Sequence, residues 1–267
     1  MDSILWEQIF QGEQIPAKLT QQGWARLPAE HIRQKYGGRP RILAKMDEYD
    51  ALPEVFRKHD AAIVSLSNRE YAILRLGRKG RPLFPSLPRD FGPSPRYVDV
   101  SALTTRILSL PWMEHFTAES QAIDAAVASC ILHDFCGESA FVLTVRGRRR
   151  FVGELPIRFR RPGQDDLVFP LKAGGFQLEI DAGYETEQAL WLIEAKQRVQ
   201  ETYNLRQVYF PYVFWRRYFR ARRVGKEVRL LYLMYSSHQY FLVELAVEDE
   251  NVWNAIRPVR QQWYVLG

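Results

Sequence analysis

The chain contains a short segment, residues 190–193, in which every residue is apolar: Leu-Trp-Leu-Ile. A strand with one face in water alternates polar and apolar residues, whereas a run that is apolar at every position is typical of a strand covered on both faces. The segment 188–196 is therefore predicted to be an inner strand of a sheet that carries other elements on both sides.

The composition allows such a strand to be buried. The chain has 267 residues, of which 46% are hydrophobic and 25% charged, which suits one large or two small ordered domains. It has no run of about 18 apolar residues, and its start does not resemble a secretory signal, so we expect a cytoplasmic protein without a membrane span. Its two cysteines, Cys130 and Cys136, form no CxxC pair and are predicted to be buried, reduced thiols.

A proline-rich stretch divides the chain. Residues 79–97 contain five prolines and two glycines. Proline fixes φ and lacks the N–H donor, so this stretch can be neither a long helix nor a central strand. We expect it to connect an N-terminal α+β module, about residues 1–100, with a second domain at 101–267.

The N-terminal module shows a helix followed by a hairpin. Residues 52–59 predict a short helix, and 61–67 and 70–76 predict two strands joined by a tight turn at Asn68-Arg69. This order is typical of a winged-helix-like DNA-recognition module and equally of a structural lid, so the sequence leaves both interpretations open.

The second domain is predicted to run helix, about three strands, helix, and one or two strands. Residues 119–136 have a helical apolar spacing, with Gly137 placed to end the helix. A later helix begins at Asn204, a favourable N-cap, and Pro211 should kink it or shift its start. The remaining predictions are strands at 141–147, 151–160, 188–196, 227–237 and 239–247, a strand within 167–185 that ends near Asp181, and a helix over 204–223.

Three ionisable residues fall near the ends of the predicted inner strands. Glu194 and Lys196 are two residues apart in a strand, so their side chains leave the same face. Asp181 is expected to end the preceding strand, with Glu179 two residues earlier on the same face. If the two strands pair as a hairpin, Asp181 and Glu194 meet at one end of the sheet.

Two carboxylates beside one lysine suit the hydrolysis of a phosphodiester. Mg²⁺ prefers oxygen ligands and is often held by one or two carboxylates, and it lowers the pKa of a bound water molecule. A lysine can hold or deprotonate that water and stabilise negative charge on the phosphate. The alternative is a solvated Glu-Ala-Lys pair and an unrelated turn aspartate, but the apolar run before Glu194 favours a site.

The spacing of these residues resembles the motif of the PD-(D/E)xK nuclease superfamily. Glu-Ile-Asp at 179–181 is followed after twelve residues by Glu-Ala-Lys at 194–196, with Ile180 in place of the usual proline. The phrases LIEAK, NLRQVYFPYVFW, TVRGR and RILAKMDEYDALPEVF are similar to a group of type II restriction endonucleases. The resemblance implies an α/β fold with an αβββαβ core, a mixed sheet flanked by helices, over about residues 119–237.

The resemblance also implies roles for the motif residues. Asp181 and Glu194 would be ligands of Mg²⁺, the carbonyl of Ala195 would be a further ligand, and Lys196 would be the catalytic lysine.

Further residues are candidates for the same site. Nucleases of this core often carry an acid on the first helix, and Glu119 and Asp124 are candidates for it, as Glu179 is for an additional strand acid. Gln207, with Tyr212 five residues later, resembles the Gln–Tyr helix of RecB-like nucleases, in which the glutamine orients the attacking water or a phosphate. A capping or surface glutamine is the alternative.

Basic residues gather around the motif in a chain whose net charge is +6. They form three runs, within 146–150, 158–161 and 206–229. Arginine binds phosphate with two hydrogen bonds, so such runs can follow a DNA backbone, although a charged run is more often a solvated face. The arginines predicted to contact DNA are Arg146, Arg148, Arg149, Arg206, Arg216, Arg217 and Arg220.

The sequence thus predicts a Mg²⁺-dependent type II restriction endonuclease that cuts double-stranded DNA, acting as a homodimer because two strands need two active sites. The alternatives are a DNA-repair or structure-specific nuclease of the same fold, and a non-catalytic DNA-binding protein with a decayed nuclease core. Neither a P-loop nor a GxGxxG motif occurs, so no nucleotide cofactor is expected.

Overall fold

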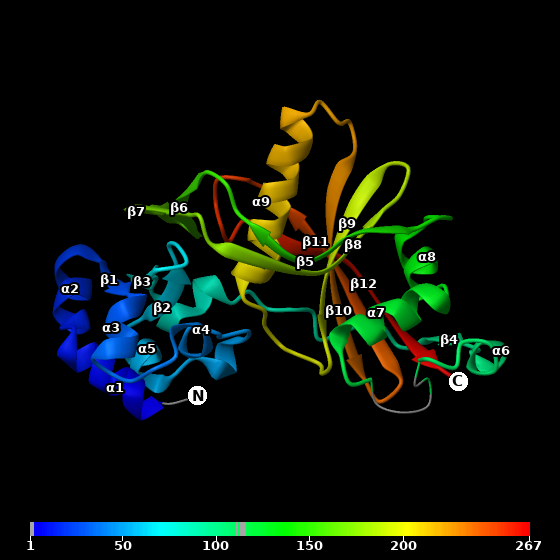
Figure 1. Cartoon of the computed structure of the whole chain (residues 1–267), viewed down its shortest axis with the longest axis horizontal. Coiled ribbons are helices and arrows are strands. Elements are labelled where there is room, and N and C mark those ends of the chain that lie inside the picture. The colour runs from blue at the N-terminus through cyan, green and yellow to red at the C-terminus, as the bar shows by residue number, and fades with distance from the viewer. Residues whose placement is uncertain (1–2, 111, 113–115) are drawn as a thin grey trace.

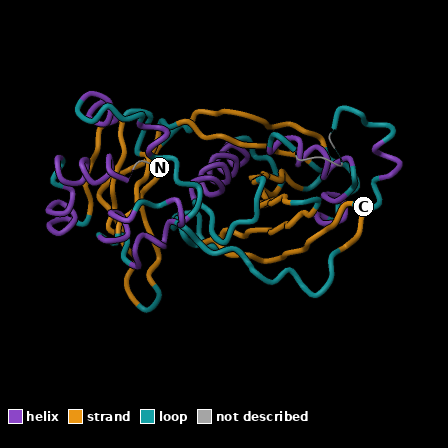
Figure 2. The backbone as a smooth tube through the Cα atoms, turned by 90° about the horizontal axis from the view of Figure 1, so that it is seen from below, coloured by secondary structure: helices purple, strands orange, loops and turns teal. Residues whose placement is uncertain are grey.

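The computed structural model describes residues 3–110, 112 and 116–267 and contains both helices and strands (Figure 1). A small N-terminal module lies at one end of the molecule, and the C-terminus lies toward the other end (Figure 2). The larger domain is built on a seven-stranded mixed sheet with helices on both faces, which agrees with the predicted α/β class. In the described part of the chain, no helix is long and apolar enough to cross a membrane.

The N-terminal module is a three-stranded antiparallel sheet, in the order β1-β3-β2, covered by short helices. The predicted hairpin and the helix before it are confirmed, and the helix is shorter than expected. Strand β1 was not predicted, because a five-residue segment that contains an arginine and a proline has no clear strand pattern. The elements of the N-terminal module are α1 (Ser3–Gly12), α2 (Ile15–Gln22), β1 (Trp24–Pro28), α3 (Ala29–Gln34), α4 (Pro40–Leu43), η1 (Tyr49–Ala51), α5 (Glu54–Lys58), β2 (Ala61–Ser65) and β3 (Glu70–Arg75).

The turn between β2 and β3 is docked on the larger domain. The carbonyl of Leu66 accepts the N–H of Gly174 at 2.8 Å, and the side chain of Asn68 accepts the N–H of Gln177 at 2.9 Å. The hairpin turn is therefore held against the larger domain, while Asn68 and Arg69 at its tip remain exposed.

The proline-rich stretch is extended, as predicted, after the short helix η2 (Arg78–Leu83). It runs along the larger domain, where the N–H of Leu87 donates to the carbonyl of Glu201 at 2.8 Å. It ends in β4 (Arg96–Val98), which adds an edge strand to the large sheet beside β12. The helix α6 (Ser101–Thr104) follows.

The large sheet has the strand order β4-β12-β11-β10-β9-β8-β5. Strands β9 and β10 are parallel and are joined through helix α9, whereas β8 and β9 form an antiparallel hairpin. Strands β6 and β7 form a separate two-stranded ribbon between β5 and β8. The bounds are β5 (Val142–Arg150), β6 (Glu154–Arg161), β7 (Gln164–Gly174), β8 (Gln177–Glu185), β9 (Ala189–Lys196), α9 (Leu205–Ala221), β10 (Glu227–Ser236), β11 (Gln239–Val247) and β12 (Ile256–Leu266).

Strand β9 is covered on both faces, as its apolar run predicts. All eight of its residues are buried. Trp191 and Ile193 pack in the cluster that includes α7 and α8, and Leu190 and Leu192 pack in the cluster that includes α9. The helices lie on opposite sides of the sheet in Figure 1. Any polar side chain at the end of β9 is therefore held in a buried and rigid setting.

The predicted single helix over 119–136 is wrong: it is two helices, α7 (Glu119–Ala128) and α8 (Ile131–Cys136). The chain breaks at Cys130, whose φ of 60° is left-handed. The apolar spacing continues across the break, so the sequence pattern did not reveal it. Cys130 is exposed, which corrects its prediction as a buried thiol, whereas Cys136 is buried as expected. Gly137 ends α8 as predicted, with a φ of 71°.

Helix α9 begins as predicted. The side chain of Asn204 accepts the N–H of Arg206 at 3.0 Å and so caps the first turn. Pro211 lies inside the helix and does not shift its start. It removes the N–H that residue 211 would otherwise donate to the carbonyl of Gln207.

Candidate active site

Strands β8 and β9 separate at the position where Asp181 and Glu194 would face each other. Their pairing runs from Glu185 opposite Leu190 to Ala182 opposite Ile193 and stops there. In place of a further main-chain bond, the Asp181 carboxylate accepts the N–H of Ala195 at 2.9 Å. This bond holds Asp181 beside the last residues of β9, where the two strands diverge.

The predicted end of the strand at Asp181 is wrong. Strand β8 continues to Glu185, and Asp181 lies near its middle. What ends at Asp181 is the pairing with β9, while β8 stays paired with β5 on its other side across an irregular register. The two carboxylates are still brought together, because it is the loss of pairing that frees Asp181 to turn toward β9.

Lys196 lies between two carboxylates. Its Nζ is 2.5 Å from an oxygen of Glu194 and 3.6 Å from an oxygen of Glu119, the first residue of α7. The side chains of Lys196 and Glu194 are each 10% exposed, and that of Glu119 is 40% exposed. The structure thus joins the acid at the start of α7 to the cluster at the end of β9.

Burial and mutual repulsion disturb the ionisation of this cluster. Burial, with the neighbouring charge of Asp181, raises the pKa of Glu194 to about 8, although Lys196 opposes the shift. Burial also raises the pKa of Asp181 and that of Glu119. Burial by itself lowers the pKa of Lys196, but the surrounding carboxylates outweigh it and the pKa is raised. Three carboxylates therefore share one ammonium, and the cluster has an excess of negative charge.

The carboxylates of this cluster suit a hard divalent cation that keeps part of its water shell. Among the described residues, no group of three His, Cys, Asp or Glu side chains is arranged to hold a metal ion. Mg²⁺ needs fewer protein side chains, because it keeps several waters and is commonly bound by one or two carboxylates. Asp181 and Glu194 supply that pair, and the uncompensated charge around them is what a divalent cation would neutralise.

The other two candidate acids form no ion pair with Lys196, although the charge of Glu179 adds to burial in raising the pKa of Asp181. Asp124 binds Arg146 at 2.7 Å and accepts the hydroxyl of Tyr184 at 3.2 Å, so it ties α7 to β5 and β8. Glu179 is exposed and pairs with Arg148 at 3.4 Å. Of the acids singled out on the first helix, only Glu119 reaches Lys196.

Gln207 lies in the first turn of α9, next to the cluster. It lines a cavity of about 10 Å³ together with Glu194, which is room for about one water molecule. Its Nε2 donates to the carboxylate of Asp47 at 3.3 Å. Asn204 makes the helix cap, so the alternative of Gln207 as the capping residue is not what the structure has. Tyr212 is half-buried on the same helix.

Asp47 was not found by the sequence analysis. It belongs to the N-terminal module, in the segment between α4 and η1. Its charge nevertheless raises the pKa of Glu119 in the candidate site, and the charge of Lys45 lowers that pKa. Within the sequence, Asp47 is one of several acids in Met-Asp-Glu-Tyr-Asp and nothing distinguishes it from its neighbours.

Three of the predicted DNA-contacting arginines lie on β5, which pairs with the strand that carries Asp181. Arg146 pairs with Asp124, and this bond with the nearby charge of Asp181 raises the pKa of Arg146. Arg148 pairs with Glu179. Arg149 is exposed and has no ion-pair partner in the part of the chain that the structure describes. These residues line the edge strand next to the strand that carries Asp181.

The four predicted arginines of α9 also contact other residues of this chain. Arg206 is half-buried and reaches the carbonyl of Ala44 at 3.5 Å. Arg216 and Arg220 both bind Glu250, and Arg217 donates to the carbonyl of Glu154. These contacts give the run a structural use, as ion pairs do for Arg146 and Arg148, but β5 is the better candidate for a DNA surface because it pairs with the strand that carries Asp181.

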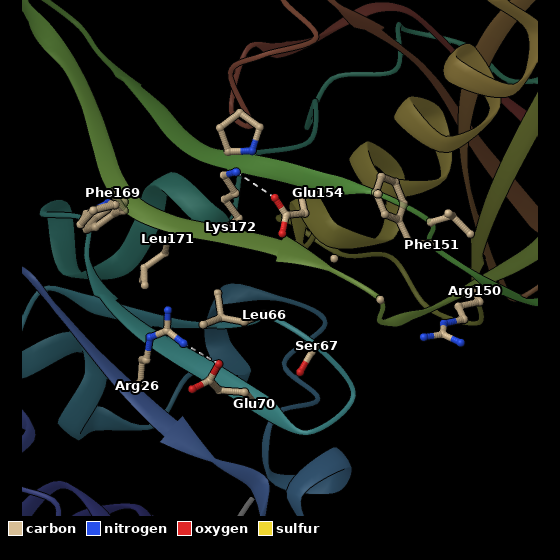
Figure 3. A pocket seen from close by; sticks show the side chains of 16 residues that line it. Arg26, Leu66, Ser67, Glu70, Arg150, Phe151, Glu154, Phe169, Leu171 and Lys172 are labelled. Carbon is tan, nitrogen blue, oxygen red and sulfur yellow. Dashed lines mark hydrogen bonds and ion pairs between the residues drawn. The ribbon is translucent and has the colours of Figure 1, made fainter. Parts of the chain in front are cut away.

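A large open groove lies elsewhere, between the N-terminal module and the strands β5, β6 and β7 (Figure 3). Its volume is about 1070 Å³. Four of its lining charges are paired within each wall, Arg26 with Glu70 and Lys172 with Glu154, as the dashed lines in Figure 3 show, whereas Arg150 has no ion-pair partner among the described residues. The carboxylate cluster is not part of this groove, so size alone does not identify the active site.

Two family models match the chain. Residues 3–73 match a model described as Domain of unknown function (DUF6996), and residues 94–265 match one described as Domain of unknown function (DUF6997). The second match covers well over half of the chain, so the protein belongs to the DUF6997 family. No curated protein and no solved structure matches the chain.

Proposed function

We propose that this protein is a Mg²⁺-dependent endonuclease of the PD-(D/E)xK type that cuts double-stranded DNA at a specific sequence, as type II restriction endonucleases do. One observation carries the proposal: Asp181, Glu194 and Lys196 converge where two strands of one sheet separate. A buried excess of carboxylates lowers the stability of a fold unless a cation compensates it.

The residues of this chain that would hold Mg²⁺ are Asp181 and Glu194, with the main-chain carbonyl of Ala195. Glu119 belongs to the same charged cluster. Bound Mg²⁺ would neutralise charge on a DNA phosphate and lower the pKa of a water molecule. The N–H of Ala195 holds the carboxylate of Asp181, and Lys196 holds that of Glu194.

Lys196 would act as an ammonium. Because its pKa is raised, it carries its proton at neutral pH. In this form it can orient a water molecule through its N–H donors and stabilise the negative charge that develops on a phosphate oxygen. Attack of water on phosphorus would break the bond to the 3′-oxygen and leave a 5′-phosphate.

DNA would approach along β5 in this proposal. Arg146, Arg148 and Arg149 are the predicted arginines beside the cluster, and Arg146 and Arg148 could exchange their carboxylate partners, Asp124 and Glu179, for phosphates of DNA. The docked turn of the N-terminal module leaves its other elements to contact bases. We further propose a homodimer on DNA, because cutting both strands needs two active sites, in a cytoplasmic enzyme that uses no nucleotide cofactor.

Incubation of plasmid DNA with the protein and Mg²⁺ tests the proposal. Lys196→Ala should lower the cleavage rate at least about 100-fold, because a positioned acid–base or electrostatic group contributes that much. Lys226→Ala is a matched control, since Lys226 also pairs with a glutamate, Glu185 at 2.6 Å, but on another part of the sheet. Equal rates for the two variants would contradict the proposal.

The pattern of products separates the alternatives. Discrete fragments support a restriction endonuclease, whereas a smear supports a less specific nuclease of the same fold. DNA that is bound by the wild type but left uncut in Mg²⁺ would support a binding protein with a decayed core instead.

A further inference from the structure

A short segment of the N-terminal module, residues 44–50, lies against the loop that leads from the active site to α9. Its main chain is anchored there twice. The carbonyl of Asp47 accepts the N–H of Asn204 at 2.9 Å, and the carbonyl of Met46 accepts the side chain of Asn204 at 2.6 Å. Asn204 in turn caps α9. These bonds use backbone atoms of the segment, so they do not depend on the side chain of Asp47.

Two neighbouring contacts add to this anchor. The N–H of Tyr49 donates to the hydroxyl of Thr202 at 2.9 Å, and Glu48 pairs with Arg198. The segment is therefore docked along the whole loop that follows Lys196, and the position of its side chains relative to α9 is well defined.

The side chain of Asp47 pairs with Lys45 of its own segment at 3.6 Å, and it makes one contact with α9 that the docking does not require. It accepts a hydrogen bond from Nε2 of Gln207 at 3.3 Å. A carboxylate can only accept, so the amide nitrogen of Gln207 must face Asp47 and the amide oxygen must face the other way. Asp47 therefore decides which end of the Gln207 amide is turned toward the active site.

The oxygen of the Gln207 amide is buried and has no hydrogen-bond partner in the described part of the chain. Buried acceptors are nearly always satisfied, so this oxygen is suited to a donor that the protein itself does not supply. Gln207 and Glu194 line the same cavity, with room for about one water molecule. A water that donates to the Gln207 oxygen would lie beside a carboxylate of the active site.

We infer that Asp47 is a positioning residue of the active site, contributed by the N-terminal module, which orients Gln207 so that its oxygen accepts a hydrogen bond from the water that attacks the phosphate. The inference rests on the proposed nuclease function. It makes docking of the module a condition for full activity, because the catalytic core alone would leave the Gln207 amide free to rotate.

Three variants test this with plasmid cleavage under single-turnover conditions. Asp47→Ala should lower the rate up to about 100-fold, the scale on which a misplaced reacting group is felt, with unchanged DNA affinity and melting temperature. Gln207→Glu should lower it as well, because two carboxylates then face each other. Asp50→Asn is the matched control, since Asp50 lies in the same segment, is exposed, and its side chain has no ion-pair or hydrogen-bond partner among the residues that the structure describes; it should leave the rate unchanged.

The combination Asp47→Asn with Gln207→Glu should restore most of the lost rate. The amide introduced at 47 can donate to the carboxylate introduced at 207, whose second oxygen still accepts in the cavity. A purely structural role of Asp47 would give no such rescue, and two independent losses would add rather than cancel.

A second readout needs neither Mg²⁺ nor DNA. Proton exchange of the Gln207 side-chain amide, assigned by NMR with Gln207→Ala, should be slow in the wild type and faster in Asp47→Ala. The inference is overturned if Asp47→Ala changes neither exchange nor cleavage while Lys196→Ala abolishes cleavage. If the wild type does not cleave at all, the proposed function fails, and this inference fails with it.

Discussion

Two glutamates of this protein are equally buried and yet ionise in opposite ways. Glu13 in the N-terminal module and Glu194 in the larger domain are each 8% exposed. Burial raises the pKa of both, but for Glu13 the bonds from Lys35 and His31 outweigh it and the pKa is lowered. The pKa of Glu194 is raised to about 8.

The difference lies in the balance of donors and acceptors. Glu13 is a single carboxylate that receives Lys35 at 3.0 Å, Tyr36 at 3.2 Å and His31 at 3.3 Å. Glu194 has Lys196 as its partner and competes for it with two other acids. A buried carboxylate that receives several hydrogen bonds stabilises the fold. A buried carboxylate that shares one cation with other acids destabilises the fold and is therefore a candidate for a functional role. This contrast, together with the position of Glu194 on a strand that is buried along its whole length, distinguishes the candidate site.

The strongest test of the contrast between Glu13 and Glu194 is the variant Glu194→Gln. We expect the cleavage rate to fall at least about 100-fold, because a metal ligand is lost. The melting temperature at neutral pH should rise, because glutamine does not have the free-energy cost of a buried carboxyl whose pKa is raised to about 8. Measurements of cleavage and of thermal unfolding on the same preparation check this. A lowered melting temperature would show that Glu194 is structural like Glu13.

The two glutamates should also give opposite dependences of stability on pH. The pKa of Glu13 is lowered in the folded state, so its stabilisation is present above about pH 4.5 and is lost as the pH falls further. The pKa of Glu194 is raised to about 8, so its destabilisation is absent below about pH 4.5 and grows as the pH rises toward 8.

Denaturant unfolding of Glu13→Gln and Glu194→Gln measures this. Relative to the wild type, Glu13→Gln should lose about 1–3 kcal/mol at pH 7 and less at low pH, because a charged hydrogen-bonded group is removed. Glu194→Gln should gain stability that increases from pH 5 to pH 8. Parallel pH profiles for the two variants would refute the contrast.

The smallest expected effect is that of Mg²⁺ without DNA. A cation that binds only the folded state raises its stability, by about 1 kcal/mol when its concentration is about five times its dissociation constant. We expect Mg²⁺ to raise the melting temperature of the wild type and of Glu13→Gln but not of Glu194→Gln, and a chelator to reverse the shift. An equal rise in all three proteins would place the cation elsewhere.

The sequence identified the parts of the site that depend on one strand. Glu194 and Lys196 follow from the period of two within β9, and the burial of that strand follows from its apolar run. Asp181 was found as a partner, but its position within β8 was not, because the point where two paired strands separate depends on both of them.

Residues supplied by other elements could not be ranked in this way. Glu119 and Asp124 lie on one helix, and the sequence did not distinguish between them as candidates. Only the packing of α7 on the sheet places Asp124 beside Arg146 of β5 and Glu119 beside Lys196 of β9. The break at Cys130 was hidden for a similar reason, since an apolar spacing continues across it.

Local patterns of the chain were thus sufficient for the mixed α/β class, the buried inner strand and the pair of charges at its end, because strand period and burial act over a few residues. Three-dimensional packing was needed for the acid from α7 and for Asp47, which lies 160 residues from Gln207 in the chain. Such contacts depend on how separate elements dock, and no period or spacing within a single element encodes them.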